Sequence, residues 1–137
     1  MGWLIDTCIW VDVERGRISP ADVERYTGKA PVYLSPVTMA ELAYGVENSP
    51  DPGIKTKRQA ALNRLRKKPV LHITEETGLI LGPLVHSLAK SGRATQHRIQ
   101  DLWIGAQAIQ HGISLLTRNA KDFSDIPGLD IVEYGKV

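Results

Sequence analysis

Trp3-Leu4-Ile5-Asp6-Thr7 is the stretch from which the fold can be worked out. The three apolar residues form a run short enough for one strand, and the run stops at Asp6, a residue type that favours the N-cap of a helix. After it, Ile9, Trp10 and Val13 recur at helical spacing. The sequence therefore begins with a predicted strand, a cap and a helix.

The same alternation continues along the chain. Helical patterns are predicted for residues 20–28, 36–48, 54–67, 75–90 and 97–110, with Pro83 expected to kink or divide the fourth. Apolar runs predict strands at residues 32–34, 70–73, 113–116 and 129–132, and residues 117–128 are expected to form a loop. Strands separated by helices need crossovers, so we expect an α/β fold with a mainly parallel central sheet, helices on both faces, and ligands beyond the carboxyl ends of the strands.

Length and composition limit the possible classes of protein. With 137 residues, 42% of them hydrophobic, and no repeat or flexible linker, the chain is expected to form one domain spanning residues 1–137. Its single cysteine, Cys8, cannot form an internal disulfide, which suits a reducing, cytoplasmic environment. No apolar run approaches the ~20 residues of a membrane helix, and no export signal or glycine-rich nucleotide-binding loop is present.

The basic residues are unevenly distributed. The formal net charge is only +2, but seven of the seventeen Lys and Arg residues lie between Lys55 and Lys68, where there is no acid. The rest of the chain is net acidic. Such a segment is either a solvated helix face or a surface that attracts phosphates, which makes nucleic acid a candidate partner.

Three acids stand alone in uncharged stretches. Asp6 is the only charged residue among the first eleven, Glu41 the only one in residues 30–46, and Asp101 the only one in residues 99–117, counting His as neutral. Burying an ionised carboxylate is costly unless a cation or hydrogen-bond donors compensate, and these stretches contain no Lys or Arg. A hard divalent ion such as Mg²⁺, held by a few carboxylates and water, would supply the charge and suit phosphodiester chemistry.

Each acid also has an ordinary interpretation. Asp6 can simply cap the first helix, Glu41 can be a solvated helix residue, and Asp101 can pair with Arg98 one turn earlier. His72, within an apolar run, is expected to be a packed core residue. Only the three acids together favour a shared metal site.

Four motifs in order now suggest a family. They are Leu4-Ile5-Asp6-Thr7, Ser35-Pro36-Val37-Thr38-Met39-Ala40-Glu41-Leu42, Asp101-Leu102-Trp103-Ile104-Gly105-Ala106 and Thr117-Arg118-Asn119-Ala120-Lys121-Asp122-Phe123. With these motifs the whole chain resembles a PIN-domain ribonuclease of the VapC toxin type. The resemblance implies a homodimer that cleaves RNA, and a small antitoxin that inhibits it by inserting a basic residue among the acids. It also implies that Asp6, Glu41 and Asp101 form the active site, with Asp6 and Asp101 binding Mg²⁺ or Mn²⁺.

The chain departs from that family pattern at two positions. Cys8 stands where many relatives have Asn, and Asn119 stands where many have an acid. We assign the fourth catalytic position to Asn119 and keep Asp122, three residues later, as the alternative. Two other functions remain open: a receiver-like signalling domain that accepts a phosphoryl group, and a catalytically weak RNA-binding protein of the same fold.

Overall fold

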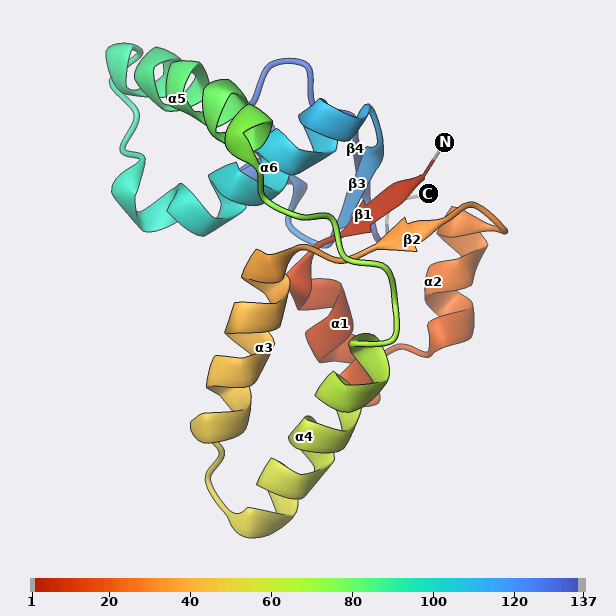
Figure 1. The fold of residues 1–137 in the computed structure, drawn as a ribbon. Coiled ribbons are helices and arrows are strands. Elements are labelled where there is room, and N and C mark those ends of the chain that lie inside the picture. The colour runs from red at the N-terminus through yellow and green to blue at the C-terminus, as the bar shows by residue number, and fades with distance from the viewer. Residues whose placement is uncertain (1, 136–137) are drawn as a thin grey trace.

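A four-stranded sheet in the order β2-β1-β3-β4 runs through the molecule (Figure 1). The computed structural model describes residues 2–135. The strands are β1 (Trp3–Ile5), β2 (Val32–Tyr33), β3 (Ser114–Thr117) and β4 (Ile131–Glu133), and every pairing is parallel. In the central pair Ile5 lies beside Leu116, so β1 and β3 end at the same edge of the sheet. The predicted parallel sheet is confirmed.

Within residues 2–135, six helices connect and cover the strands. They are α1 (Thr7–Glu14), α2 (Pro20–Thr27), α3 (Pro36–Glu47), α4 (Pro52–Leu65), α5 (Glu75–Lys90) and α6 (Ile99–His111). Three of them start in the same way: Ser19, Ser35 and Asp51 each accept a hydrogen bond from a backbone N–H of the first turn, and proline follows. Figure 1 shows α3 and α4 running in opposite directions as a hairpin that projects from the sheet.

The sheet separates two apolar cores. Leu4 of β1 and Leu115 of β3 pack with α5 and α6 on one face, whereas Ile5 and Leu116 pack with α1 and α2 on the other. This division follows from the strand period of two, which sends successive side chains to opposite faces. Helices therefore cover both faces, as predicted.

The structure corrects one predicted strand. Residues 70–73 form only an isolated bridge, between Val70 and Leu34, because the neighbouring segment leaves the sheet at Ser35, the N-cap of α3. Beyond that bridge His72 and Ile73 are exposed, so the prediction that His72 packs in a core is wrong. The chain then turns directly into α5.

Two predicted helices also differ in detail from the structure. Pro83 does not divide α5, because the carbonyl it leaves without a backbone donor belongs to Leu79, whose side chain is 70% exposed and where water has access. The predicted helix over residues 97–110 begins as a 3₁₀ turn, η1 (Gln96–Arg98), and becomes α6 at Ile99. A second 3₁₀ turn, η2 (Ala120–Asp122), lies within the loop that follows β3. Among the described residues, no helix is both long and apolar enough to span a bilayer.

Candidate active site at the carboxyl edge of the sheet

Asp6 follows β1 directly and is buried at the edge where β1 and β3 end. Its backbone N–H donates to Leu116 O at 2.9 Å, and its Oδ1 accepts the N–H of Thr7 at 2.8 Å. Its Oδ2 accepts the Thr117 hydroxyl at 2.7 Å and the Cys8 thiol at 3.3 Å. Asp6 is therefore the N-cap of α1 and also a fixed carboxylate at the sheet edge, so both interpretations of this residue hold.

Glu41 lies in the second turn of α3, where it is half-buried rather than solvated. The Thr7 hydroxyl oxygen is 2.8 Å from Glu41 Oε1 and 2.9 Å from the hydroxyl oxygen of Thr38, which is fully buried one turn earlier on α3. Thr7, the residue after Asp6, therefore contacts Glu41 on α3.

Asp101 lies in the first turn of α6 and is half-buried. The alternative in which Asp101 pairs with Arg98 is not what the structure shows: Arg98 forms two hydrogen bonds to the Asp125 carboxylate, at 2.8 and 2.6 Å, and a third to the backbone carbonyl of Asp122 at 3.0 Å. No side chain within residues 2–135 forms a hydrogen bond or ion pair with the Asp101 carboxylate. It is the acid with the least local compensation.

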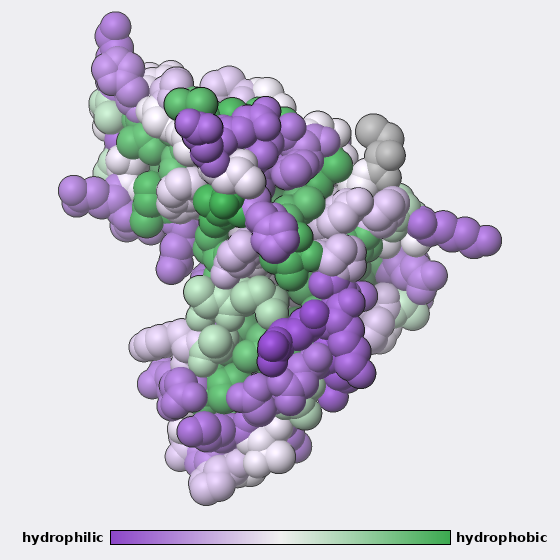
Figure 2. Space-filling view, in the orientation of Figure 1, coloured by the Kyte–Doolittle hydropathy of each residue, from purple (hydrophilic) through white to green (hydrophobic). Residues whose placement is uncertain are grey.

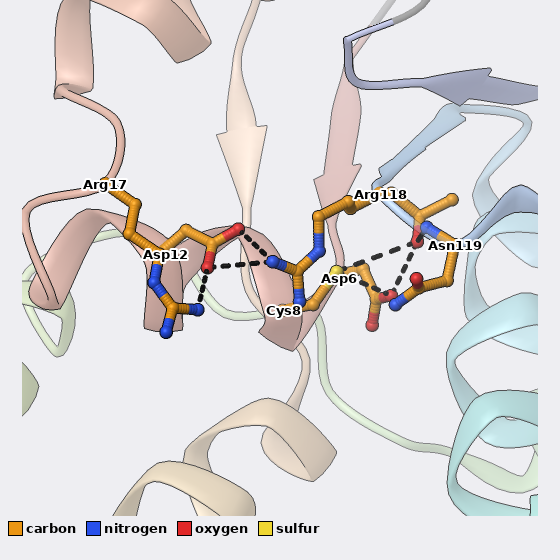
Figure 3. A network of polar contacts seen from close by, with 7 residues as sticks. Asp6, Cys8, Asp12, Arg17, Arg118 and Asn119 are labelled. Carbon is orange, nitrogen blue, oxygen red and sulfur yellow. Dashed lines mark hydrogen bonds and ion pairs between the residues drawn. The ribbon is translucent and has the colours of Figure 1, made fainter.

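The loop after β3 also borders the site. Arg118 points away from Asp6 and forms hydrogen bonds of 2.8 and 3.0 Å to the buried carboxylate of Asp12 on α1, whereas Cys8 and Asn119 lie toward Asp6 (Figure 3). The Asn119 backbone N–H donates to the Thr117 hydroxyl at 3.1 Å. The Arg118 ion pair therefore anchors the loop to α1 and leaves its other residues beside the acids.

The negative charges of these acids affect one another's pKa values. Burial is the main cause of a raised pKa at Asp6, Glu41 and Asp101. The pKa of Asp101 rises to about 6, from burial first and then from the negative charges of Asp6, Asp122 and Glu41. The Asp122 charge also raises the pKa of Asp6. The acid that follows β1 and the acids of α3, α6 and η2 therefore lie close enough to repel one another.

This arrangement fits a divalent ion better than it fits an internal ion pair. In the described part of the chain, no Lys or Arg forms an ion pair with Asp6, Glu41 or Asp101, because the nearby arginines are bonded to Asp12 and Asp125. The carboxylates and hydroxyls of the site offer oxygen atoms as metal ligands, the ligand type that Mg²⁺ prefers. Within residues 2–135, no three acidic, His or Cys side chains already form an enclosing ligand group. An ion here would therefore be held by few carboxylates, with water in the remaining positions.

Sequence reasoning missed the hydroxyls of this site. Thr7, Thr38 and Thr117 are all buried and all form hydrogen bonds within it. A weak signal existed, because Thr7 and Thr117 are polar residues at the ends of buried strands. Thr38 shares a helix face with Glu41, three residues away, but only the packing of α1 against α3 reveals its contact with Thr7.

Comparison with known proteins supports this description. Residues 3–129 match the model of the PIN domain family. The chain is 35% identical over 133 residues to ribonuclease VapC1 of Rickettsia felis, with 96% of each chain covered. Two solved structures have a similar fold: VapBC-1 of nontypeable Haemophilus influenzae (TM-score 0.82, 27% identity, 99% and 100% coverage) and DNA-bound VapBC2 of Rickettsia felis (0.84, 24%, 98% and 99%).

Fold and site together define an α/β protein with a cluster of unpaired carboxylates at the carboxyl edge of a parallel sheet. The family match spans nearly the whole chain and agrees with the motifs at Asp6, Glu41 and Asp101. The chain belongs to the PIN domain family and, within it, to the VapC proteins. A receiver-like signalling domain is thereby excluded.

Proposed function

We propose that this chain is a divalent-metal-dependent endoribonuclease that acts in the cytoplasm as the toxin of a toxin-antitoxin pair. The observation that carries the proposal is the convergence of Asp6, Glu41 and Asp101 in one field without a pairing cation. The ribonuclease name of the 35% identical relative supports RNA as the substrate. The seven basic residues between Lys55 and Lys68, on and just after α4, add positive charge suited to phosphates.

The proposed mechanism divides two tasks among the three acids. Asp6 and Asp101 would hold Mg²⁺, or Mn²⁺, which when bound lowers the pKa of water and neutralises charge on the phosphate oxygens. Glu41 orients the attacking water and accepts its proton, a task that suits a carboxylate whose pKa is raised. Hydrogen bonds from Thr117 and Thr7 keep two of these carboxylates in fixed positions. Water attacks the phosphorus in line with the leaving oxygen, and no covalent enzyme intermediate is needed.

Asp6→Asn tests the active-site assignment. The amide keeps the size of the side chain and can still cap α1, so we expect cleavage of RNA to disappear while the thermal unfolding temperature changes little. Glu76→Gln, at an exposed position in the first turn of α5, is the matched control and should cleave normally. Undiminished cleavage by folded Asp6→Asn would refute the assignment. Wild-type protein that binds RNA without Mg²⁺-dependent turnover would instead indicate the catalytically weak RNA-binding protein.

The fourth catalytic position needs its own comparison. We assign it to Asn119, which follows Thr117 and lies beside Asp6, while Asp122 supplies the nearest additional negative charge. Asn119→Ala should reduce turnover more than Asp122→Asn. The reverse order would transfer the position to Asp122.

An antitoxin partner follows from the VapBC complexes among the structural relatives. The surface that suits it is a groove of about 430 Å³ between α1, α2 and α4, lined by apolar residues including Val13, Val23 and Leu65, with Arg64 and Lys68 also lining it. An apolar segment fits this groove, and a basic residue of the same partner can satisfy the unpaired acids bidentately. Co-purification with the product of a neighbouring small gene, and rescue of growth by it, test this partner. Glu24→Arg, at an exposed position that also lines the groove, should weaken the complex without affecting cleavage.

Self-association is the second partner proposal. Tyr44 on α3 and Leu79 on α5 are each 70% exposed, and residues 77–89 of α5 contain no Asp, Glu, Lys or Arg. Figure 2 shows hydrophobic residues over α5, in contrast to the hydrophilic surface over α4. A homodimer would bury the α5 face against its counterpart. Sedimentation analysis of Leu79→Arg should show monomers where wild type is dimeric.

A further inference from the structure

We infer that Thr7 is a positioning residue, which holds Asp6 and Glu41 in one geometry through its backbone and its side chain, with Thr38 supporting it from behind. The inference rests on the proposed function, since it concerns the same acids. It assigns a task to a residue that touches neither the substrate nor the reacting atoms.

Thr7 contacts both acids at once. Its backbone N–H donates to Asp6 Oδ1 at 2.8 Å, and its hydroxyl oxygen lies 2.8 Å from Glu41 Oε1. Asp6 caps α1, which Thr7 begins, and Glu41 lies on α3, so Thr7 connects two segments that approach each other only in the folded molecule. No other described residue has a hydrogen bond to each of these two carboxylates.

The direction of the two hydroxyl contacts follows from counting protons. A threonine hydroxyl has one proton to donate and two lone pairs to accept with. A carboxylate can only accept hydrogen bonds, so the Thr7 hydroxyl donates its proton to Glu41. In the contact of 2.9 Å to Thr38 the Thr7 hydroxyl is again the donor, so its one proton faces a second acceptor that is uncharged and therefore weaker than Glu41. Fully buried Thr38 is thus a neighbour of the Thr7 hydroxyl, and Glu41 is its charged partner.

The Thr7 hydrogen bond opposes a specific tendency of Glu41. Burial raises the pKa of Glu41, and the negative charge of Asp6 adds to the rise, so the two carboxylates repel each other. A glutamate side chain has three rotatable bonds and can move away from such a neighbour. The Thr7 hydroxyl keeps it in place and favours its charged form. Holding a reacting group in position by neighbouring hydrogen bonds is worth about 10- to 100-fold in activity at comparable sites.

Two substitutions at Thr7 separate this task from simple packing. Thr7→Val keeps the shape of the side chain but lacks the hydroxyl, whereas Thr7→Ser keeps the hydroxyl and lacks the methyl group. We expect Thr7→Val to lower the single-turnover cleavage rate about 10- to 100-fold, with little change in the affinity for RNA measured in EDTA. Thr7→Ser should restore most of the rate. A Thr7→Val rate equal to wild type, or a Thr7→Ser rate as low as that of Thr7→Val, would overturn the inference.

Thr38→Val is the companion variant if Thr7→Val does not fold. Because Thr7 can still donate to Glu41 when Thr38 is absent, Thr38→Val should lower the rate less than Thr7→Val does, and never more than tenfold. A larger loss would contradict the assignment of Thr7 as the residue that positions Glu41. Folding of each variant is checked by its thermal unfolding temperature.

A readout that needs no catalysis distinguishes this inference from the proposed function. In metal-free protein, carboxyl-carbon NMR of Glu41 during a pH titration should show a higher pKa in Thr7→Val than in wild type, because the hydroxyl favours the carboxylate. If wild type cleaves no RNA but this pKa difference is present, the positioning task stands and the proposed function fails. If wild type cleaves RNA and the pKa does not change, the positioning task fails alone.

Discussion

Replacing Asp101 with Asn should make the metal-free protein more stable at neutral pH, although it removes a charged residue from the proposed active site. The pKa of Asp101 is raised from 3.8 to about 6, first by burial and then by the charges of Asp6, Asp122 and Glu41. The folded state therefore binds this proton more tightly than the unfolded chain does. Stability is lost as the pH rises from about 4 to about 6, and the cost is complete at pH 7.

The magnitude follows from the same pKa. At about 1.4 kcal/mol for each pH unit between 3.8 and about 6, the ceiling is about 3 kcal/mol. Asp101 is only half-buried, and the solvent around its exposed part screens the repulsion. We therefore expect Asp101→Asn to raise the free energy of unfolding by about 1–2 kcal/mol at pH 7.5. The gain should shrink toward zero near pH 4, where the wild-type carboxyl is neutral in both states.

Urea unfolding in EDTA between pH 4 and pH 8 measures this difference. Asp125→Asn is the matched control, because Arg98 lowers the pKa of Asp125 to about 2 and its charge stabilises the fold. That variant should lose stability at neutral pH, and because the loss diminishes only as the pH falls from about 4 toward 2, it should stay nearly constant across the measured range. The reasoning is refuted if Asp101→Asn is less stable than wild type at pH 7.5, or if its gain does not depend on pH.

Three further changes test other parts of the structure. Adding Mg²⁺ to EDTA-treated protein should raise the unfolding temperature of wild type but not of Asp101→Asn, because binding to the folded state stabilises it; equal shifts would argue against Asp101 as a ligand. Arg98→Ala should cost about 2–3 kcal/mol in urea unfolding, because Asp125 then loses its two-bond partner, and a neutral result would show that Arg93 suffices. Gly112→Ala should cost about 1–2 kcal/mol, since Gly112 ends α6 with φ at +61°, whereas Ala at exposed Gly82 of α5 serves as a control with no such cost.

Most of the fold was predictable because its signals are local. Ser19, Ser35 and Asp51 mark helix starts by their own chemistry, and Gly112 marks a helix end. The apolar run at residues 70–73 gave the same local signal as a strand. Whether such a run pairs over its length depends on how long its neighbour is, and β2 offers two residues.

That the three acids of the candidate site lie near one another was predictable, and their hydrogen-bond partners were not. Asp6, Glu41 and Asp101 are conspicuous because their sequence neighbours carry no charge. Arg98, by contrast, forms its hydrogen bonds with Asp125, 27 residues later, and not with Asp101, three residues later. The contact between Thr7 and Glu41 likewise depends on how two helices cross. Pattern and spacing do not contain that information.

The order of the strands has a consequence for how this protein is made. β1 is the first strand to leave the ribosome, yet one of its two neighbours is β3, which begins at Ser114. Pairings between such distant segments form late, after most of the polypeptide has been synthesised. An unfinished nascent chain therefore contains Asp6 without Thr117 to hold it. The proposed active site is therefore complete only after synthesis has passed β3, and a shorter nascent chain lacks the contact that fixes Asp6.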